Sequence, residues 1–300
     1  MADRSAHNYD LLAIDLDGTF LGPGSSVLDE NVAAVRRARE AGLKVVFCTG
    51  RGLAESGFAF EACGLEHADP VVVAGGALVS DPRDGATLHR FEMSKSLVDE
   101  ACVKLNRLGH PAMVLKDRAA AGYDYLVVQG DGLSLDPVTE WWFAQLDVLV
   151  RFARDTEKDE HPEFTVRVGA CARAQTLEPV QSMLRALLGD RALMQQFKAV
   201  VQAEHEADGG EEVHILEIFD ARAHKWGALE WVLDREGISA ERVCAIGDEI
   251  NDLTMLQHAG MGVAMGNAID ELRLVADRLC EPNHERGVAR TIDRVLDGEW

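Results

Sequence analysis

YDLLAIDLDGT, residues 9–19, is the stretch of this 300-residue chain that decides its fold. The run 9–16 is rich in Leu and Ile and predicts a buried strand. Asp15 and Asp17 stand at its end, and side chains two residues apart on an extended chain point the same way. The carboxyl edge of a sheet is where open α/β folds bind ligands, so this pair of carboxylates is a candidate site.

Alternating strands and helices surround this stretch. A helix is predicted over residues 29–41, because apolar side chains recur on one side of it and Gly42 follows its end. Other strands are predicted at 43–48, 70–73 and 77–80. The rhythm resumes at residue 213, with further elements predicted around 227–237, 242–246, 253–259, 262–265 and 288–296. Strand, helix and strand in this order predict an α/β fold with a parallel sheet.

Between residues 89 and 212 the pattern changes. Strand-like runs at 112–116, 125–129, 163–169 and 193–203 lie among helices predicted at 94–108, 137–147 and 177–188. The acidic loop 204–212 contains Gly209-Gly210 and indicates a hairpin tip. Because strands adjoin strands here, we expect an α+β insert with an antiparallel sheet. The predicted organisation is a core from residues 1–88 and 213–300, interrupted by an inserted domain at 89–212.

The composition excludes several classes of protein. Hydrophobic residues make up 47% of the chain and charged residues 27%, as in ordinary globular proteins. No apolar run approaches the length of about eighteen residues that a transmembrane helix needs, and the charged start of the chain does not resemble a signal peptide. With 51 acidic against 30 basic residues the net charge is −21, which disfavours nucleic acid and anionic lipid as partners. Six scattered cysteines without a C-x-x-C pair indicate reduced thiols, and we expect a cytoplasmic protein.

Three further elements stand at the ends of predicted strands. Thr49-Gly50-Arg51 combines a hydroxyl, a glycine that permits close approach and a guanidinium, which suit a phosphate. Gly247-Asp248-Glu249-Ile250-Asn251-Asp252 supplies oxygen ligands of the kind that Mg²⁺ takes. Lys225 precedes a predicted helix. Taken singly, each of these elements, like the Asp15 and Asp17 pair, also fits an ordinary turn, an acidic helix N-terminus or a solvated side chain.

Together the four elements are more informative than any one of them. Each follows a separate predicted strand, so a parallel sheet brings all four to one edge. Asp15, Asp17, Asp248 and Asp252 would then share a pocket, and like charges at such short range are unfavourable unless a cation neutralises them. A divalent metal together with Lys225 would do so. The sequence therefore predicts a site for Mg²⁺ and phosphate.

With these four elements the chain resembles a haloacid dehalogenase (HAD) superfamily phosphatase of the Cof-type, sugar-phosphatase-like group with the larger inserted (C2B) cap. The resemblance rests on the four elements above and extends to Gly262-Val-Ala-Met-Gly-Asn-Ala and Arg286-Gly-Val-Ala. It covers residues 9–88 and 213–296. It implies a Rossmann-like catalytic core and a cap domain that reads the leaving group and so sets substrate specificity.

The resemblance also implies a role for each matched residue. Asp15 would be the nucleophile that takes the phosphoryl group, and Asp17 would protonate the leaving alcohol and then activate water. Asp15, the backbone carbonyl of Asp17 and Asp248 would bind Mg²⁺, and Asp252 would orient Lys225 or a metal-bound water. Contacts to the phosphate would come from Gly18, Thr49, Gly50, Arg51, Lys225 and Asn251.

Two positions depart from the pattern of the group. Gly75 stands where relatives commonly have Asn, and Trp226 stands where they often have Gly after the motif lysine. Neither departure removes a catalytic group. Both put an inherited substrate preference in doubt.

The function that this resemblance implies is hydrolysis of a small phosphorylated metabolite, with sugar phosphates favoured, by a Mg²⁺-dependent phosphoric monoester hydrolase that is a monomer or homodimer. A phosphomutase of the same superfamily is the nearest alternative. A receiver-like signalling domain uses a similar acidic cluster, but such domains are much shorter and lack an insert. A non-catalytic phosphate-binding relative is the remaining alternative, although every matched catalytic position is intact.

Overall fold

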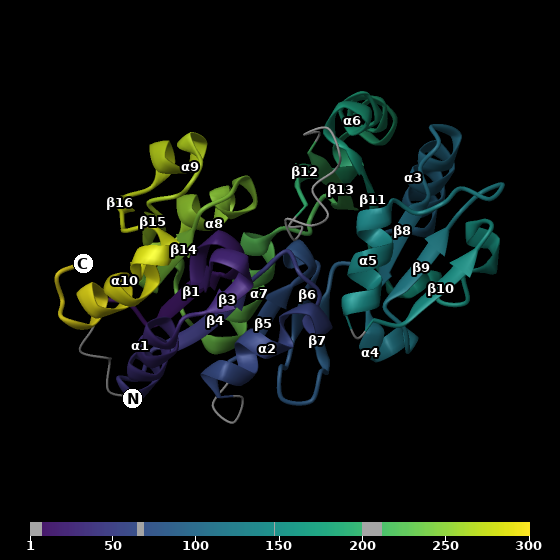
Figure 1. Cartoon of the computed structure of the whole chain (residues 1–300). Coiled ribbons are helices and arrows are strands. Elements are labelled where there is room, and N and C mark those ends of the chain that lie inside the picture. Colours follow the sequence, from purple (N-terminus) through teal and green to yellow (C-terminus); the bar gives the residue numbers. More distant parts are fainter. Residues whose placement is uncertain (1–7, 65–68, 147, 200–211) are drawn as a thin grey trace. The chain divides into compact units, whose positions relative to one another are not determined.

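The structure is a computed structural model that describes residues 8–64, 69–146, 148–199 and 212–300 (Figure 1). The chain divides into two compact units. The core unit consists of the chain up to His89 and from His224 on, and the inserted unit is Arg90–Ala223. The predicted α/β class is confirmed, because the core unit holds a mostly parallel sheet and the inserted unit a separate mixed one.

The described strands of the core unit form a sheet in the order β16-β15-β14-β1-β4-β5-β6-β7. Neighbouring strands from β16 to β5 run parallel, and β6 pairs antiparallel with β5. The chain adds β4 and β5 on one side of β1, and later β14 to β16 on the other side. The strand order therefore reverses at β1, and such a reversal opens a crevice at the carboxyl ends of the strands. The strands are β1 (Leu11–Asp15), β4 (Lys44–Cys48), β5 (Val71–Val73), β6 (Leu78–Ser80), β7 (Thr87–Arg90), β14 (Val243–Gly247), β15 (Met261–Ala264) and β16 (Arg278–Leu279).

Two groups of helices accompany this sheet. One consists of α1 (Asp29–Glu40), which packs against α2 (Leu53–Cys63) and α10 (Gly287–Leu296). In the other, α8 (Leu253–His258) packs against α7 (Lys225–Glu236) and α9 (Asp270–Val275). Val32, Val35 and Ala38 of α1 recur at helical spacing and are buried, as predicted from the sequence. Smaller elements are the hairpin of β2 (Leu21–Gly22) with β3 (Ser26–Val27) and helical turns at Leu16–Phe20, Pro23–Ser25, Ala74–Gly76, Ala240–Arg242, Ile250–Asp252 and Asn283–Glu285.

The inserted unit is built on a second sheet, whose described strands lie in the order β10-β9-β8-β11-β13-β12. Its pairs are antiparallel except β9 with β10, which is parallel. α3 and α6 pack against each other and against this sheet, and their apolar side chains, such as Ala101, Leu105 and Leu184, form one core with those of the strands. The elements are α3 (Lys95–Arg107), β8 (Ala112–Lys116), α4 (Arg118–Ala121), β9 (Tyr125–Val128), α5 (Pro137–Gln145), β10 (Val150–Ala153), β11 (Thr165–Arg173), α6 (Ala174–Leu188), β12 (Ala192–Lys198) and β13 (Val213–Asp220), with short helical turns at Thr156–Lys158, Pro162–Phe164 and Gly189–Arg191.

The second boundary of the insert lies later than the sequence predicts. We expected the core to resume at residue 213, but the strand that begins there, β13, pairs with β11 and β12 of the inserted unit. Both neighbours take up its backbone hydrogen bonds, so the chain returns to the core unit only at His224. The first boundary, between His89 and Arg90, lies one residue from the predicted one. The predicted hairpin tip at 204–212 falls largely on residues 200–211, which lie outside the described residues.

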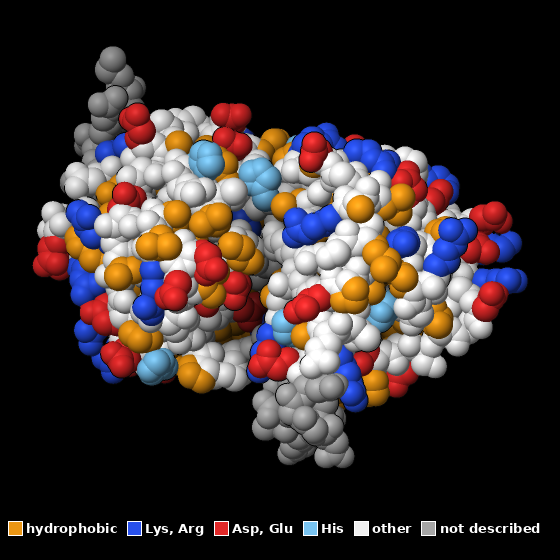
Figure 2. All heavy atoms as spheres, turned by 90° about the horizontal axis from the view of Figure 1, so that it is seen from above, with side chains coloured by type: hydrophobic (Ala, Val, Ile, Leu, Met, Phe, Trp, Pro, Cys, Tyr) orange, Lys and Arg blue, Asp and Glu red, His pale blue; other side chains and the backbone are white. Residues whose placement is uncertain are grey.

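On the face shown in Figure 2, Asp and Glu side chains are interspersed with Lys and Arg. Among the helices that the structure describes, none has both the length and the apolar character needed to cross a membrane.

Candidate active site

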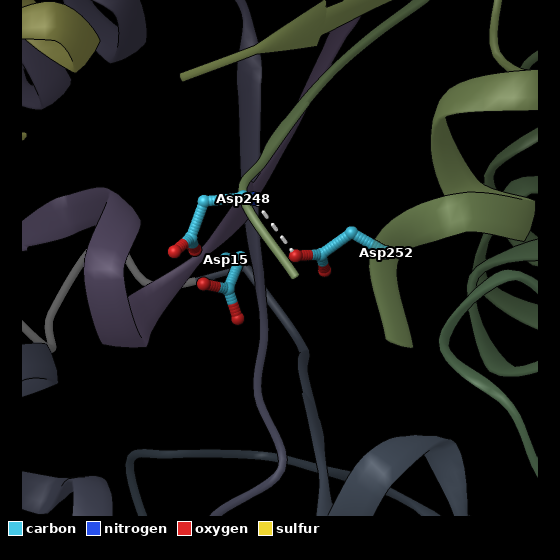
Figure 3. Close-up of side chains that lie close together, drawn as sticks. All are labelled: Asp15, Asp248 and Asp252. Atoms are coloured by element: carbon cyan, nitrogen blue, oxygen red, sulfur yellow. Dashed lines mark hydrogen bonds between the residues drawn. The ribbon is translucent and has the colours of Figure 1, made fainter. Parts of the chain in front are cut away.

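Three carboxylates meet at the carboxyl edge of the core sheet. Asp15 is the last residue of β1, Asp248 follows β14, and Asp252 ends the turn Ile250–Asp252. One oxygen from each lies within 4.8 Å of the others. Figure 3 shows the three side chains close together. β1 and β14 are parallel neighbours in register, with Ile14 opposite Ile246. The parallel pairing therefore brings together residues that are more than two hundred positions apart in the sequence.

Lys225 joins this group as a buried cation. Its Nζ donates to Asp15 Oδ1 and to Asp252 Oδ1, each at 2.6 Å, and to Asn251 Oδ1 at 3.3 Å. The side chain has no exposed surface. Burial alone would lower the pKa of Lys225, but the carboxylates of Asp15 and Asp252 outweigh this effect and raise it. The ammonium group is thus held in its charged form inside the protein.

A glycine allows the chain to place this lysine. α7 begins at Lys225, where the His224 imidazole accepts a hydrogen bond from the Gly227 backbone. A Cβ on Gly76 would lie 2.2 Å from the carbonyl carbon of His224, so only glycine fits where the turn Ala74–Gly76 passes this residue.

The two departures from the group's pattern have structural explanations. Gly75 adopts a left-handed backbone, with φ +68°, and Asn is the other residue that tolerates this conformation. Trp226 is buried and stacks on His258 of α8, with ring centres 5.5 Å apart. Its indole therefore packs between helices of the core unit.

Asp252 is fully engaged in holding the site together. Its Oδ1 accepts from Lys225, and its Oδ2 accepts from the backbone N–H groups of Asp248 at 3.0 Å and Glu249 at 3.1 Å. The side chain is completely buried. Asp252 thereby fixes both the lysine and the loop that carries Asp248.

Asp248 is held by two side chains that the sequence analysis did not single out for the site. Thr19 Oγ1 donates to Asp248 Oδ1 at 2.8 Å. Asn267 Nδ2 donates to the Gly18 carbonyl at 2.8 Å and to Asp248 Oδ2 at 3.3 Å. Gly18 has φ +74°, and a Cβ there would lie 2.1 Å from Asp248 Oδ2. Only glycine therefore permits this approach. The position of Asn267 in the sequence indicates that it lies near the site, because it follows β15, a neighbour of β14 at the same sheet edge.

The electrostatics of the group favour a bound cation. Burial and then repulsion from Asp252 raise the pKa of Asp15 well above its usual value, although Lys225 partly opposes this. Burial and repulsion from Asp252 also raise the pKa of Asp248 to about 7. Two carboxylates whose ionised forms are disfavoured by burial and by a neighbouring carboxylate gain from a positive ion between them. Because every donor is a carboxylate oxygen, the residues fit a hard cation.

The remaining predicted residues lie around this group. Thr49 is buried after β4, and its Oγ1 accepts a hydrogen bond from the Arg51 backbone at 3.1 Å. A Cβ on Gly50 would lie 3.8 Å from Asn251 Nδ2, so these two predicted residues are neighbours. The Arg51 guanidinium binds the Asp17 carboxylate, which is a contact that the sequence analysis did not foresee.

Comparison with known proteins identifies the family. The family model for haloacid dehalogenase-like hydrolases matches residues 12–292. The chain belongs to this family. A Bacillus subtilis member, 5-amino-6-(5-phospho-D-ribitylamino)uracil phosphatase YwtE, is 30% identical over 96% of this chain and 99% of its own. Pyridoxal phosphate phosphatase YbhA of Escherichia coli is 26% identical over 94% of this chain and 97% of its own.

Solved structures of the family share the fold. A haloacid dehalogenase-like hydrolase from Bacteroides thetaiotaomicron superimposes with a TM-score of 0.76, at 24% identity, over 96% of this chain and 99% of its own. The resemblance seen in the motifs is therefore confirmed. The chain is a HAD-type phosphatase, and its aspartate group lies where such a fold binds ligands.

Proposed function

We propose that this HAD phosphatase hydrolyses small phosphorylated metabolites, sugar phosphates among them, through an aspartyl-phosphate intermediate and with Mg²⁺. The observation that carries the proposal is the cluster of Asp15, Asp248 and Asp252, in which the charged Lys225 donates hydrogen bonds to Asp15 and Asp252. The two curated relatives are named for phosphate esters of small molecules, which supports the same class of substrate.

In this proposal Asp15 is the nucleophile. One of its oxygens attacks the phosphorus, the bond from phosphorus to the ester oxygen breaks, and an acyl phosphate forms on Asp15. Asp17, two residues further on, gives a proton to the leaving alkoxide. Water then attacks the acyl phosphate, Asp17 takes a proton from that water, and inorganic phosphate leaves.

The phosphate would be held by Lys225, Thr49 and Asn251, with the backbones of Gly18 and Gly50. The ammonium of Lys225 already lies 2.6 Å from the proposed nucleophile and would stabilise charge on the equatorial oxygens. Asp15, the Asp17 carbonyl and Asp248 are the proposed metal ligands. A bound Mg²⁺ would screen the repulsion between the carboxylate and the phosphate and hold the two in line.

Activity should require a divalent metal. EDTA is expected to abolish phosphate release, and added Mg²⁺ to restore it. Ca²⁺ should inhibit, because it takes more ligands in looser geometry and can engage both oxygens of Asp15. The measurement is phosphate release from a panel of phosphorylated sugars, nucleotides and cofactors, without any bisphosphate activator. Full turnover in EDTA would contradict the metal assignment, and isomerised product that forms only after a bisphosphate activator is added, without phosphate release, would indicate a phosphomutase.

We also propose that the inserted unit sets substrate specificity. All the proposed catalytic residues lie in the core unit, while the inserted unit has its own sheet and its own apolar core. When Arg90–Ala223 is replaced by a short Gly-Ser linker from His89 to His224, metabolite turnover should fall strongly while small aryl phosphates remain substrates. Circular dichroism first establishes that the variant is folded. Equal loss on both substrate types would mean that the inserted unit takes part in the chemistry.

A further inference from the structure

Both oxygens of the Asp17 carboxylate accept hydrogen bonds from Arg51. Arg51 Nε donates to Asp17 Oδ2 at 2.8 Å, and Arg51 Nη2 donates to Asp17 Oδ1 at 2.6 Å. This is the fork geometry in which a guanidinium fixes the plane of a carboxylate as well as its position. Asp17 itself lies on the turn Leu16–Phe20, where its own backbone and that of Gly18 are not helical. The turn alone does not determine where its side chain points.

Arg51 is in turn fixed from several directions. Its backbone N–H donates to Thr49 Oγ1, and its carbonyl accepts from the Ala74 backbone at 2.7 Å. Its Nη2 also donates to Ser25 Oγ at 2.9 Å, and the guanidinium lies 5.9 Å from the ring centre of Phe58. The guanidinium side chain is 22% exposed, whereas the Asp17 side chain is 37% exposed. Arg51 is more buried and has more contacts than Asp17, so it can hold the Asp17 carboxylate in place.

Ser25 provides a second, independent sign of this arrangement. Its backbone has φ +59°, in the left-handed region that residues other than glycine seldom adopt. Such a conformation persists where the surroundings determine it, commonly at functional sites. Here the strained turn between β2 and β3 places the Ser25 hydroxyl where it accepts a hydrogen bond from the guanidinium that binds Asp17.

We propose that Arg51 is a positioning residue that orients the Asp17 carboxylate for proton transfer, with Ser25 as its anchor, and is not a ligand of the phosphate. This inference rests on the proposed role of Asp17. Arg51 donates from Nε and Nη2 to Asp17 and from Nη2 to Ser25, while a separate, fully buried cation, Lys225, lies against the nucleophile. Sequence motifs alone favoured phosphate binding, because they do not show which anion a guanidinium contacts.

The two roles differ in what Arg51→Ala does to kcat/KM with different leaving groups. If Arg51 acts through Asp17, kcat/KM for an alkyl phosphate should fall on the order of a hundredfold, because a misplaced proton donor no longer assists a poor leaving group. With an aryl phosphate, whose leaving group needs little protonation, kcat/KM should change by less than about threefold, as should the inhibition constant of inorganic phosphate. Equal losses on both substrates with weakened phosphate inhibition would overturn the proposal.

Arg51→Lys separates geometry from charge. Lysine keeps the positive charge but cannot form the two-pronged contact with a carboxylate. We therefore expect Arg51→Lys to behave like Arg51→Ala on the alkyl phosphate. Near-normal activity of the lysine variant would mean that charge alone suffices and would contradict a positioning role.

A double-mutant cycle with Asp17→Asn completes the test. Asp17→Asn should slow alkyl phosphate turnover, and adding Arg51→Ala to it should cause less than about a twofold further loss, because the group that Arg51 positions is already disabled. If the two losses multiply, the inference is wrong while the role of Asp17 stands. If Asp17→Asn itself is without effect, the proposed function fails first.

Two further variants test the anchor of Arg51 and control for the loss of an arginine. Ser25→Ala should give a smaller loss with the same dependence on the leaving group, since it removes one anchor of Arg51. Arg83→Ala is the matched control, because Arg83 also forms a two-pronged pair, with Asp81, on the surface of the core unit. It should leave both substrates unaffected. A leaving-group dependence in the Arg83 variant would show that the effect is not specific to Arg51.

Discussion

No phosphoenzyme should form in the Asp15→Asn variant with any substrate, whereas the Asp17→Asn variant should accumulate it. Asparagine at position 15 removes the proposed nucleophile. Asparagine at position 17 keeps the nucleophile and removes only the proton-transfer group. With an aryl phosphate the first step is then nearly spared, but the second step still needs a base to activate water. The expected loss in turnover for Asp17→Asn is on the order of a hundred- to ten-thousandfold.

The difference is measured by rapid acid quench and intact mass. An added phosphoryl group should appear on the Asp17 variant and be absent from the Asp15 variant. Asp293→Asn is a suitable control, because Asp293 is a half-exposed carboxylate paired with Arg37 on the surface of the core unit. It should resemble the unmodified protein. A phosphoryl group on the Asp15 variant would mean that the roles of the two aspartates are reversed.

The arrangement at the sheet edge explains why the sequence could place several candidate site residues close together. Asp15 ends β1, and Thr49 and Asp248 directly follow β4 and β14, which run parallel to β1, so their proximity depends on strand direction alone. The loops and helices between them do not alter this. Lys225 cannot be placed in the same way, because the strand before it, β13, belongs to the sheet of the inserted unit. It contacts Asp15 and Asp252 from the first residue of α7.

The sequence does not assign domain boundaries and strands correctly where the local hydrophobic pattern is ambiguous. The apolar run of β13 suits either sheet, and only its pairing with β11 and β12 assigns it to the inserted unit. β7 and β10 went unrecognised because they are short, and their side chains lack the alternation of a half-buried strand.

The direction in which a side chain points could likewise not be predicted from the sequence. A motif that contains Arg51 does not show whether the guanidinium turns to a phosphate or to Asp17, because rotamers and tertiary contacts decide this. Asn267 illustrates the same point. It lies in a stretch typical of the family, but its contacts with Gly18 and Asp248 depend on the pairing of β14 with β15.

The buried ion group makes Lys225→Met the substitution with the largest expected effect on stability. Methionine fills a similar space but leaves the carboxylates of Asp15 and Asp252 buried without their cation. Removing one partner of a buried ion pair typically lowers the free energy of unfolding by about 3–5 kcal/mol. The variant should also lose phosphatase activity, since the proposed cradle loses its cation. Urea unfolding should show a lower midpoint with an unchanged slope.

Lys44→Met provides the matched control. Lys44 also contacts two carboxylates of the core unit, Glu236 at 3.0 Å and Asp69 at 3.4 Å, but its side chain is 36% exposed. An exposed pair contributes at most about 1 kcal/mol, so this variant should unfold near the midpoint of the unmodified protein. Equal midpoints for the Lys225 and Lys44 variants would contradict a stabilising role for the buried group.

The stability deficit of Lys225→Met should also depend on pH in a defined direction. Lys225 is the group that lowers the pKa of Asp15, which burial and Asp252 otherwise raise. Without the lysine, the pKa of Asp15 in the folded protein rises further above its value in the unfolded chain. The folded state then binds more protons than the unfolded state, so its stability falls as pH increases. The deficit relative to the unmodified protein should therefore be smaller in mildly acidic than in mildly alkaline buffer. The opposite trend would show that the buried carboxylates are not what Lys225 neutralises.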